Sequence, residues 1–238
     1  MTSSVQTAKE KTAARGPAQP RLTYCNLFFA FLTASFLGAV TETGFMLLVW
    51  HELQNRSGVV WGTFSLVWGG GAVLFALLLR APARRGPAWV FLGGAALGSA
   101  FELLCSLFQE RAFGMRFWDY SHLSLSLGGR VDPVFSLFWG LAAVAWMCLL
   151  WPALARFLEG VSPRLLRWSA GLLTVFMLCN VTLSAAALGR MDQRRQGEPP
   201  ANGVEVFLDR RYPDRRLEER FPSMRYYGTG PAGNLPNS

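Results

Sequence analysis

Lysine is almost absent from this sequence of 238 residues, although its formal net charge is +8 at pH 7. Only Lys9 and Lys11 occur among the 23 basic residues, so the other 21 are arginine. A P-loop requires the sequence Gly-Lys-Ser/Thr, and no lysine here follows a glycine. The sequence therefore contains no Walker-type ATP-binding loop, and a lysine nucleophile within the apolar regions is also excluded.

Charged residues of all kinds are scarce, at 16% of the chain, whereas hydrophobic residues make up 51%. Soluble proteins usually contain roughly 25% charged residues. The two histidines, His51 and His122, lie in no metal-binding spacing such as H-E-x-x-H, and the four cysteines form no C-x-x-C pair. No G-x-S-x-G nucleophile motif occurs either. We therefore predict no catalytic set, no metal site and no cofactor.

Five long apolar stretches dominate the chain. They cover residues 24–50, 58–79, 88–108, 133–151 and 165–189. A membrane-spanning helix needs about 20 mainly apolar residues, and each stretch is close to that length or longer. We predict an all-α, polytopic (multi-pass) protein of the cell membrane. Its transmembrane domain, residues 24–189, would be a bundle of about five helices.

Polar tails flank the predicted bundle. Residues 1–23 carry a charge of +3 and are rich in Ser, Thr, Ala and Pro, which favours a disordered basic tail. Residues 190–238 begin with a linker and continue with aromatic residues interspersed with charge. Pro213 is expected to begin a short helix that ends before Pro222. We interpret this segment as an interaction tail that docks on the membrane domain, a lipid surface or a partner.

The distribution of basic residues bears on membrane orientation, because basic residues concentrate in short cytoplasmic loops. The N-terminal tail and the loops 80–87 and 152–164 hold nine basic residues on one side, against four in the loops of the other side. This count favours a cytoplasmic N-terminus. The C-terminal tail would lie on the opposite side, and its nine arginines oppose that assignment. Seven acidic residues accompany them, a mixture that argues against nucleic-acid binding.

Two glutamates lie inside apolar stretches, Glu42 in the first and Glu102 in the third. A carboxylate in hydrocarbon costs a few kcal/mol, so it normally faces a bundle interior, a cavity or a partner. One interpretation is an intramembrane polar site for a cation, a proton or a substrate, shared by the two helices. The other is a structural anchor, hydrogen-bonded to nearby Thr, Ser or Arg side chains.

The connection at residues 109–132 is too polar to span the membrane, yet rich in aromatic residues. Aromatic side chains of this kind concentrate at the headgroup level of a bilayer. We expect either an interfacial or re-entrant segment that covers the polar centre of the bundle, or an ordinary loop of the aromatic belt. The residues singled out as its motif are Trp118, Asp119, Tyr120, Ser121 and Arg130.

Several short motifs occur in a fixed order along the chain. Besides the two glutamates they comprise NR at 55–56, FWDYS at 117–121, GR at 129–130, FWG at 138–140, YPDRR at 212–216 and FPSMR at 221–225. With these motifs the chain resembles the type IV ABC-transporter membrane family, also called CmpB-like, over residues 24–225. The resemblance implies a permease-like subunit of a transporter. Because the chain lacks a P-loop, ATP-driven transport would require a separate ATP-binding subunit.

Two further hypotheses compete with the permease-like subunit. One is a membrane-embedded regulatory or scaffold protein that acts through its C-terminal tail. The other is an intramembrane enzyme using Glu42, Glu102 and Asp119, which we rank last because no nucleophile and base are suitably spaced. The expected partners are the lipid bilayer, a separate ATP-binding subunit and a second copy of the chain in a homo-oligomer.

Overall fold

The computed structural model describes residues 19–226 and is almost entirely helical. Four of its helical units are long and apolar enough to cross a membrane. A fifth apolar helix is shorter, with 13 residues and a length of about 20 Å. The all-α polytopic architecture is confirmed, and the expected five helices become four full-length spans and one short helix. They are α2 (Tyr24–Trp50), α3 (Leu66–Leu78), α5 (Pro87–Phe113), the continuous unit α6 (Pro133–Ala145)–η1 (Trp146–Leu150)–α7 (Trp151–Glu159), and α8 (Pro163–Arg195).

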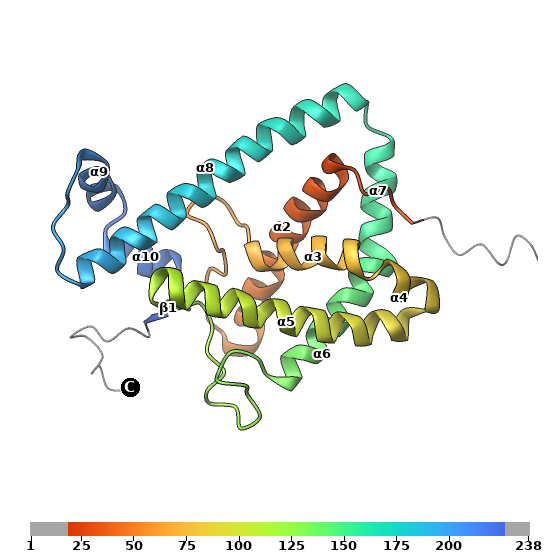
Figure 1. Cartoon of the computed structure of the whole chain (residues 1–238), viewed down its shortest axis with the longest axis horizontal. Helices are drawn as coiled ribbons and strands as arrows, with labels where there is room; N and C mark the ends of the chain where they lie inside the picture. Colours follow the sequence, from red (N-terminus) through yellow and green to blue (C-terminus); the bar gives the residue numbers. More distant parts are fainter. Residues whose placement is uncertain (1–18, 227–238) are drawn as a thin grey trace, which may run out of the picture.

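The two ends of the described chain lie on opposite sides of the bundle (Figure 1). The start of α2 lies on the same side as the short helix α4 (Arg80–Arg85) and the connection between α7 and α8. The connection after α5 and the last helices of the chain lie on the other side. The chain therefore crosses the bundle five times if α3 is counted as one crossing.

Residues 58–65, expected as the first part of the second apolar helix, form irregular backbone instead. Gly62 adopts a left-handed conformation with φ of 73°, which ends any regular helix at this point. The amide of Gly58 donates to the carbonyl of Phe64 at 2.8 Å, and that of Ser65 donates to the carbonyl of Ser35 in α2 at 2.9 Å. These bonds close the segment into a loop before α3 begins at Leu66.

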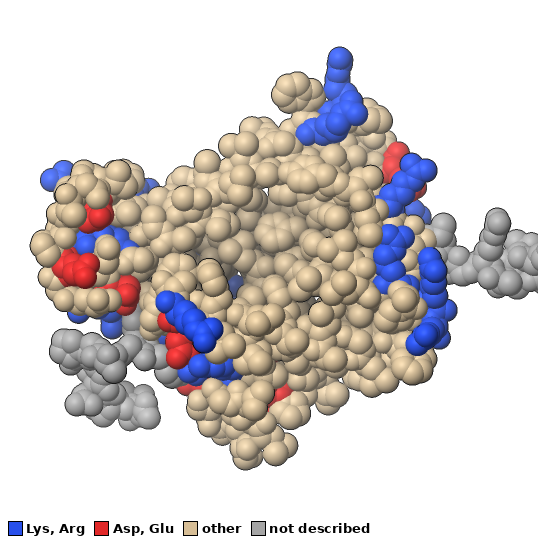
Figure 2. Space-filling view, in the orientation of Figure 1, with Lys and Arg blue, Asp and Glu red and all other residues tan. Residues whose placement is uncertain are grey.

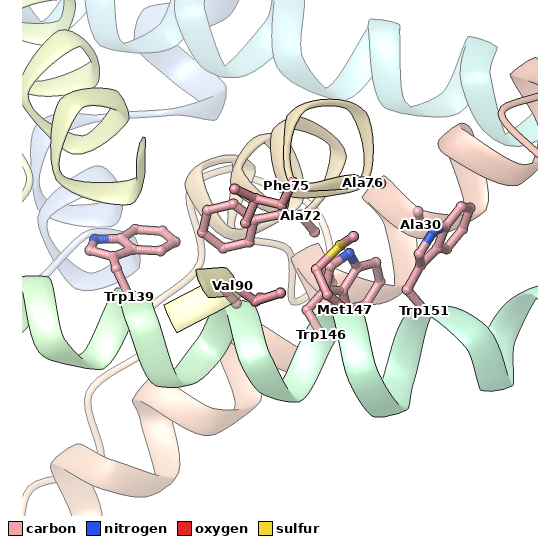
Figure 3. Packing of buried hydrophobic residues seen from close by; sticks show 12 residues of the cluster. Ala30, Ala72, Phe75, Ala76, Val90, Trp139, Trp146, Met147 and Trp151 are labelled. Carbon is pink, nitrogen blue, oxygen red and sulfur yellow. The ribbon is translucent and has the colours of Figure 1, made fainter. Parts of the chain in front are cut away.

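The core of the bundle is built around tryptophans on the α6–α7 unit. Figure 3 shows Trp139, Trp146 and Trp151 spaced along this unit, with Phe75 of α3 packed among them. Small residues let the neighbouring helices approach closely. A β-carbon added at Gly98 of α5 would lie 2.5 Å from Cγ of Trp139. The α5–α6 contact therefore depends on glycine, as in other G-x-x-x-G helix pairs.

Replacing Gly98 with valine is expected to destabilise the protein by about 1–3 kcal/mol, because the added side chain collides with the Trp139 ring. Gly171→Val provides a matched control, since Gly171 of α8 has no atom within 4 Å of an added β-carbon. Thermal unfolding of both full-length variants in mild detergent measures the difference. Equal shifts in the midpoint for the two variants would contradict the close packing of α5 on α6.

The end of the described chain folds back onto the bundle. Helices α9 (Gly203–Arg211) and α10 (Asp214–Arg220) are followed by strand β2 (Arg225–Tyr226), which pairs antiparallel with β1 (Met115–Arg116). We call residues 203–226 the C-terminal lobe. Its second helix, α10, begins directly after Pro213 and ends before Pro222, as the sequence predicted. Its apolar side chains form one buried cluster with α8 and β1, made of Met115, Ala187, Leu188, Met191, Leu208, Tyr212, Leu217, Phe221 and Met224.

Of the three docking surfaces expected for the tail, the C-terminal lobe thus uses the membrane domain of its own chain. Residues 1–18 and 227–238 lie outside the described part of the structure. Most of the expected disordered tail at 1–23 and the end of the interaction tail at 190–238 therefore fall there.

Candidate functional site

Glu102 occupies a buried position in the middle of α5, with only 5% of its surface exposed. Each of its carboxylate oxygens accepts one hydrogen bond from an aromatic side chain. The indole Nε1 of Trp139 donates to Oε2 at 3.0 Å, and the hydroxyl of Tyr120 donates to Oε1 at 2.9 Å. Among residues 19–226, no basic side chain forms an ion pair with Glu102. Its partners are therefore neutral donors.

Glu42 of α2 has a more open position, and its side chain is 36% exposed. The indole Nε1 of Trp68 in α3 donates to its Oε1 at 2.8 Å. Nε of Arg56 lies 3.6 Å from the other oxygen. Glu42 thus combines an indole partner, as Glu102 does, with a cationic partner at the edge of the bundle.

The two glutamates are connected through their tryptophans. The rings of Trp68 and Trp139 pack together with centroids 5.5 Å apart. A continuous chain of contacts therefore runs Glu42–Trp68–Trp139–Glu102–Tyr120, and we call these five residues the polar relay. The structure brings the glutamates into one assembly without direct contact between their carboxylates.

The tryptophans of the polar relay were not predicted as site residues. Glycines on the facing helices make room for their rings: a β-carbon added at Gly38 of α2 would lie 2.1 Å from Cγ of Trp68. Gly98 plays the same part for Trp139. A glycine in one apolar stretch and a tryptophan in another give no local signal of their pairing, so sequence reasoning had no means of finding it.

A polar stripe extends from Glu102 along α5. Ser99, Glu102, Ser106 and Gln109 follow one another at spacings of three and four residues, which places them on one face of the helix. The hydroxyl of Ser99 bonds to Ser136 of α6 at 2.6 Å. Ser106 Oγ and Gln109 Oε1 are buried without a hydrogen-bond partner among the described residues. Burying such groups in an apolar interior costs free energy, so the stripe extends the polar character of this face of α5 beyond Glu102.

The loop between α5 and α6 is held in shape by its own polar side chains. Asp119 Oδ1 accepts from the amide of Ser121 at 2.9 Å and from its hydroxyl at 2.6 Å. The amide of Tyr120 donates to the carbonyl of Gly129 at 2.8 Å. Gly129 has a φ of 70°, and a β-carbon there would lie 2.3 Å from Ser121 Oγ. Glycine is therefore required for the loop to close.

Tyr120 is the residue through which this loop reaches the bundle interior. Its ring stacks on Phe135 of α6 with centroids 4.4 Å apart, and its hydroxyl bonds to Glu102. Burial raises the pKa of the Tyr120 hydroxyl, and the nearby Glu102 carboxylate raises it further. The hydroxyl therefore stays protonated and remains a donor to Glu102.

The remaining motif residues support the loop from outside the polar relay. The indole of Trp118 donates to the carbonyl of Arg130 at 3.1 Å. Arg130 Nη1 and Arg116 Nε each lie 2.7 Å from the Glu110 carboxylate at the end of α5. Of the five predicted motif residues, Tyr120 alone bonds to Glu102, and the others shape or anchor the loop.

The irregular segment 58–65 is held by polar side chains of α8. Asn180, which is fully buried, accepts from the amide of Trp61 at 3.1 Å and donates to its carbonyl at 2.7 Å. Ser184 Oγ accepts from the amide of Val60 at 2.9 Å. Backbone that leaves the helical conformation within a membrane must have its polar groups satisfied by protein. These two side chains of α8 meet that requirement for Val60 and Trp61.

Arg220 of the C-terminal lobe also holds this segment. Its Nε and Nη2 donate to the carbonyl of Val59 at 3.0 and 2.8 Å, and Nη2 also donates to the carbonyl of Gly62. The lobe therefore contacts the break before α3 directly, besides packing on α8.

Ion pairs fasten the C-terminal lobe to the end of α8. Asp209 of α9 pairs with Arg190 and Arg194, and Arg194 also pairs with Asp214 of α10. Hydrogen bonds from Arg190 and Arg194 hold the pKa of the Asp209 carboxyl below its usual range, with Arg190 the larger influence. Asp209 thus stays ionised at physiological pH and keeps its bonds to α8.

No group of three or more His, Cys, Asp or Glu side chains within the described range is placed to hold a metal ion. The four cysteines are unpaired and lie in four different spans. The polar relay is therefore a hydrogen-bonded and aromatic assembly around two carboxylates, of which Glu102 is buried.

Comparison with known proteins identifies the family of the chain. The family model described as "Putative ABC-transporter type IV" matches residues 29–185. The matched segment contains both glutamates and both tryptophans of the polar relay, together with the whole loop between α5 and α6. No curated protein and no solved structure matches significantly.

Proposed function

The chain belongs to the family of putative ABC transporters of type IV, and from this we propose that it is the permease-like, membrane-spanning subunit of a transporter in the cell membrane. The observation that carries the proposal is the polar relay. It runs through four helical elements of the bundle, α2, α3, α5 and α6, and includes Tyr120 of the loop between α5 and α6. Because the sequence lacks a P-loop, a separate ATP-binding subunit would supply the energy.

The two carboxylates differ in a way that suits a transport path. Glu42 is partly exposed, whereas Glu102 is enclosed by Trp139 and Tyr120. Ionisable residues inside membranes commonly mark ion or substrate pathways. Carboxylates beside indole rings favour a positively charged group. We therefore infer that the transported species is a cation or carries a cationic group, which meets Glu42 first and Glu102 after movement of the tryptophan pair.

We also propose that the chain is not an enzyme. The bonding partners of the two glutamates are Trp68 and Arg56 for Glu42, and Tyr120 and Trp139 for Glu102. Neither carboxylate is paired with a serine or cysteine nucleophile in the described part of the chain. This arrangement is suited to binding rather than to covalent chemistry.

The alternative of a regulatory or scaffold protein acting through its C-terminal tail has less support. Tyr212, Leu217 and Phe221 are buried against the protein's own membrane domain. Arg220 donates to the backbone carbonyls of residues 59 and 62 of the same chain. The buried apolar side chains of the C-terminal lobe are therefore already packed within the chain, although Val204 and Phe207 of α9 remain exposed.

Affinity purification of the full chain in mild detergent, followed by transport assays in membrane vesicles, tests the proposal. We expect an ATP-binding subunit to co-purify and the vesicles to accumulate a cationic probe, methylammonium or rubidium, only with ATP. Glu102→Gln should keep the ATP-binding subunit but lower the accumulation rate at least about tenfold, or ~1.4 kcal/mol in barrier.

Glu219→Gln is the matched control, because Glu219 lies in the C-terminal lobe with its side chain 64% exposed. It should leave accumulation unchanged. Recovery of no ATP-binding subunit together with no ATP-dependent accumulation would exclude the transporter proposal. Loss of function in Glu219→Gln equal to that in Glu102→Gln would remove the polar relay from the path.

A further inference from the structure

One edge of the protein carries arginines without acidic partners. They come from three places in the sequence that the fold brings to the same side of the bundle: α4, the end of α7 and the first turns of α8 (Figures 1 and 2). All are exposed, and in residues 19–226 none forms an ion pair. We call them the arginine face: Arg84, Arg85, Arg156, Arg164 and Arg167.

Several arginines on the opposite side of the protein have acidic partners. There Arg56 pairs with Glu42, Arg130 with Glu110, and Arg190 with Asp209. In Figure 2 blue and red groups are mixed on that side, whereas nearly all the charged groups along the edge that holds α4 are blue. The sequence has no Asp or Glu between residues 80 and 101, and only Glu159 between 151 and 189. The arginine face is therefore left with an uncompensated positive charge.

Exposed tryptophans place the arginine face at the level of lipid headgroups. Trp89 and Trp168 are 52% and 76% exposed, and each lies within a few residues of an arginine of the face. The guanidinium of Arg85 lies over the Trp89 ring, 5.7 Å from its centroid. Exposed indole rings in membrane proteins concentrate at the boundary between hydrocarbon and water. The guanidinium groups next to them lie at that boundary too.

The connections on this side are short and do not project from the bundle. The connection between α3 and α5 consists of the six residues of α4 and one residue on each side of it. Helices α7 and α8 are joined by residues 160–162. A soluble acidic protein would have to reach the guanidinium groups at the membrane boundary itself. Lipid phosphates already lie at that depth, so the geometry favours a lipid over a protein.

We propose that the arginine face binds the phosphate groups of anionic phospholipids. A guanidinium group offers paired N–H donors whose spacing matches two phosphate oxygens. Clustered basic residues next to spanning helices attract anionic lipid, and each such residue raises the association constant about fivefold. Five such groups at two connections on the same side of the bundle provide positions for more than one headgroup. The ligand class is an anionic glycerophospholipid such as phosphatidylglycerol.

Quenching of tryptophan fluorescence by brominated lipids tests the proposal on the full chain in bilayer nanodiscs. The readout is the association of brominated phosphatidylglycerol relative to brominated phosphatidylcholine. We expect the unsubstituted protein to prefer phosphatidylglycerol by at least about fivefold, which corresponds to roughly 1 kcal/mol. Combined Arg84→Gln, Arg85→Gln and Arg164→Gln should bring the ratio close to one.

The control variant combines Arg111→Gln, Arg210→Gln and Arg215→Gln, three exposed arginines on the opposite side. It should retain the preference, and inorganic phosphate should leave the quenching unchanged. Equal association of both lipids with the unsubstituted protein would overturn the proposal, as would an equal loss in the control variant. Displacement by inorganic phosphate would identify a site for the free anion instead. If the protein showed no lipid preference, and a protein that co-purifies with the unsubstituted chain were lost from the Arg84, Arg85 and Arg164 variant, the arginine face would be a protein-binding surface instead.

Discussion

Replacing Trp139 with alanine is expected to lower the free energy of unfolding of the membrane domain by about 3–5 kcal/mol, the usual cost of removing a large buried aromatic side chain. Trp139 is only 9% exposed and packs against the rings of Trp68 and Phe75, with centroids 5.5 and 6.0 Å away. The substitution also removes the indole donor to Glu102. Unfolding in mixed detergent micelles, followed by tryptophan fluorescence, measures the loss.

Trp168→Ala is the matched control, because Trp168 is also a tryptophan of a spanning helix but is 76% exposed. We expect it to change the free energy of unfolding by less than about 1 kcal/mol. Trp139→Phe keeps an aromatic ring and removes only the N–H donor. A double-mutant cycle between Trp139→Phe and Glu102→Gln should therefore give a coupling energy of about 0.6–2 kcal/mol. Equal effects of Trp139→Ala and Trp168→Ala would show that the tryptophan pair is not the centre of the bundle.

Replacing Asn180 with leucine is expected to destabilise the protein by about 2–4 kcal/mol. The leucine side chain is similar in size, but it can neither accept from the amide of Trp61 nor donate to its carbonyl. Two backbone groups of an irregular segment would then lose their partners, and each such loss costs about 1–3 kcal/mol when the group is buried. Detergent unfolding again measures the change.

Cys179→Leu tests the same substitution at the neighbouring position, where the side chain is exposed and no hydrogen bond is lost. It should leave the free energy of unfolding within about 0.5 kcal/mol of the unsubstituted value. Arg220→Leu removes the hydrogen bonds from the C-terminal lobe to segment 58–65. Because Asn180 and Arg220 hold one segment, their effects should not add. Additive effects, or equal stability of Asn180→Leu and Cys179→Leu, would contradict a shared role in holding this break.

The apolar stretches predicted the starts of the full-length spanning helices to within two residues, whereas α5, α7 and α8 end five to eight residues beyond the predicted ends. The predicted start of the first span, residue 24, coincides with the start of α2 at Tyr24, and the α5 and α6 starts agree within one residue. Hydrophobic length and the positions of Pro87 and Pro133 are local properties, so the sequence alone suffices for them. The start of α3 could not be predicted in this way. Residues 58–65 are apolar enough for a helix, and their irregular backbone is stabilised by Asn180 and Arg220, more than 110 residues away.

The sequence likewise predicted part of the candidate site, namely its two glutamates, but not their partners. Glu42 and Glu102 stand out because a carboxylate within an apolar stretch is expensive unless the fold satisfies it. The sequence does not show which side chains donate hydrogen bonds to these two carboxylates. Trp68 and Trp139 look like ordinary apolar residues of spanning helices, and their indole donors matter only once α3 and α6 have packed against α2 and α5. Tyr120 likewise reaches Glu102 only through the turn that Gly129 permits.

The scarcity of lysine and of charge determined much about this protein without any structure. It excluded a P-loop, and together with the apolar runs it required a membrane-embedded helical chain, because such runs cannot be solvated. The tertiary structure alone decided how the glutamates are joined, why the second apolar stretch breaks, and that the C-terminal lobe folds onto its own bundle. It also decided which arginines remain unpaired. Each of these depends on distances between residues far apart in the sequence, and local composition carries no record of them.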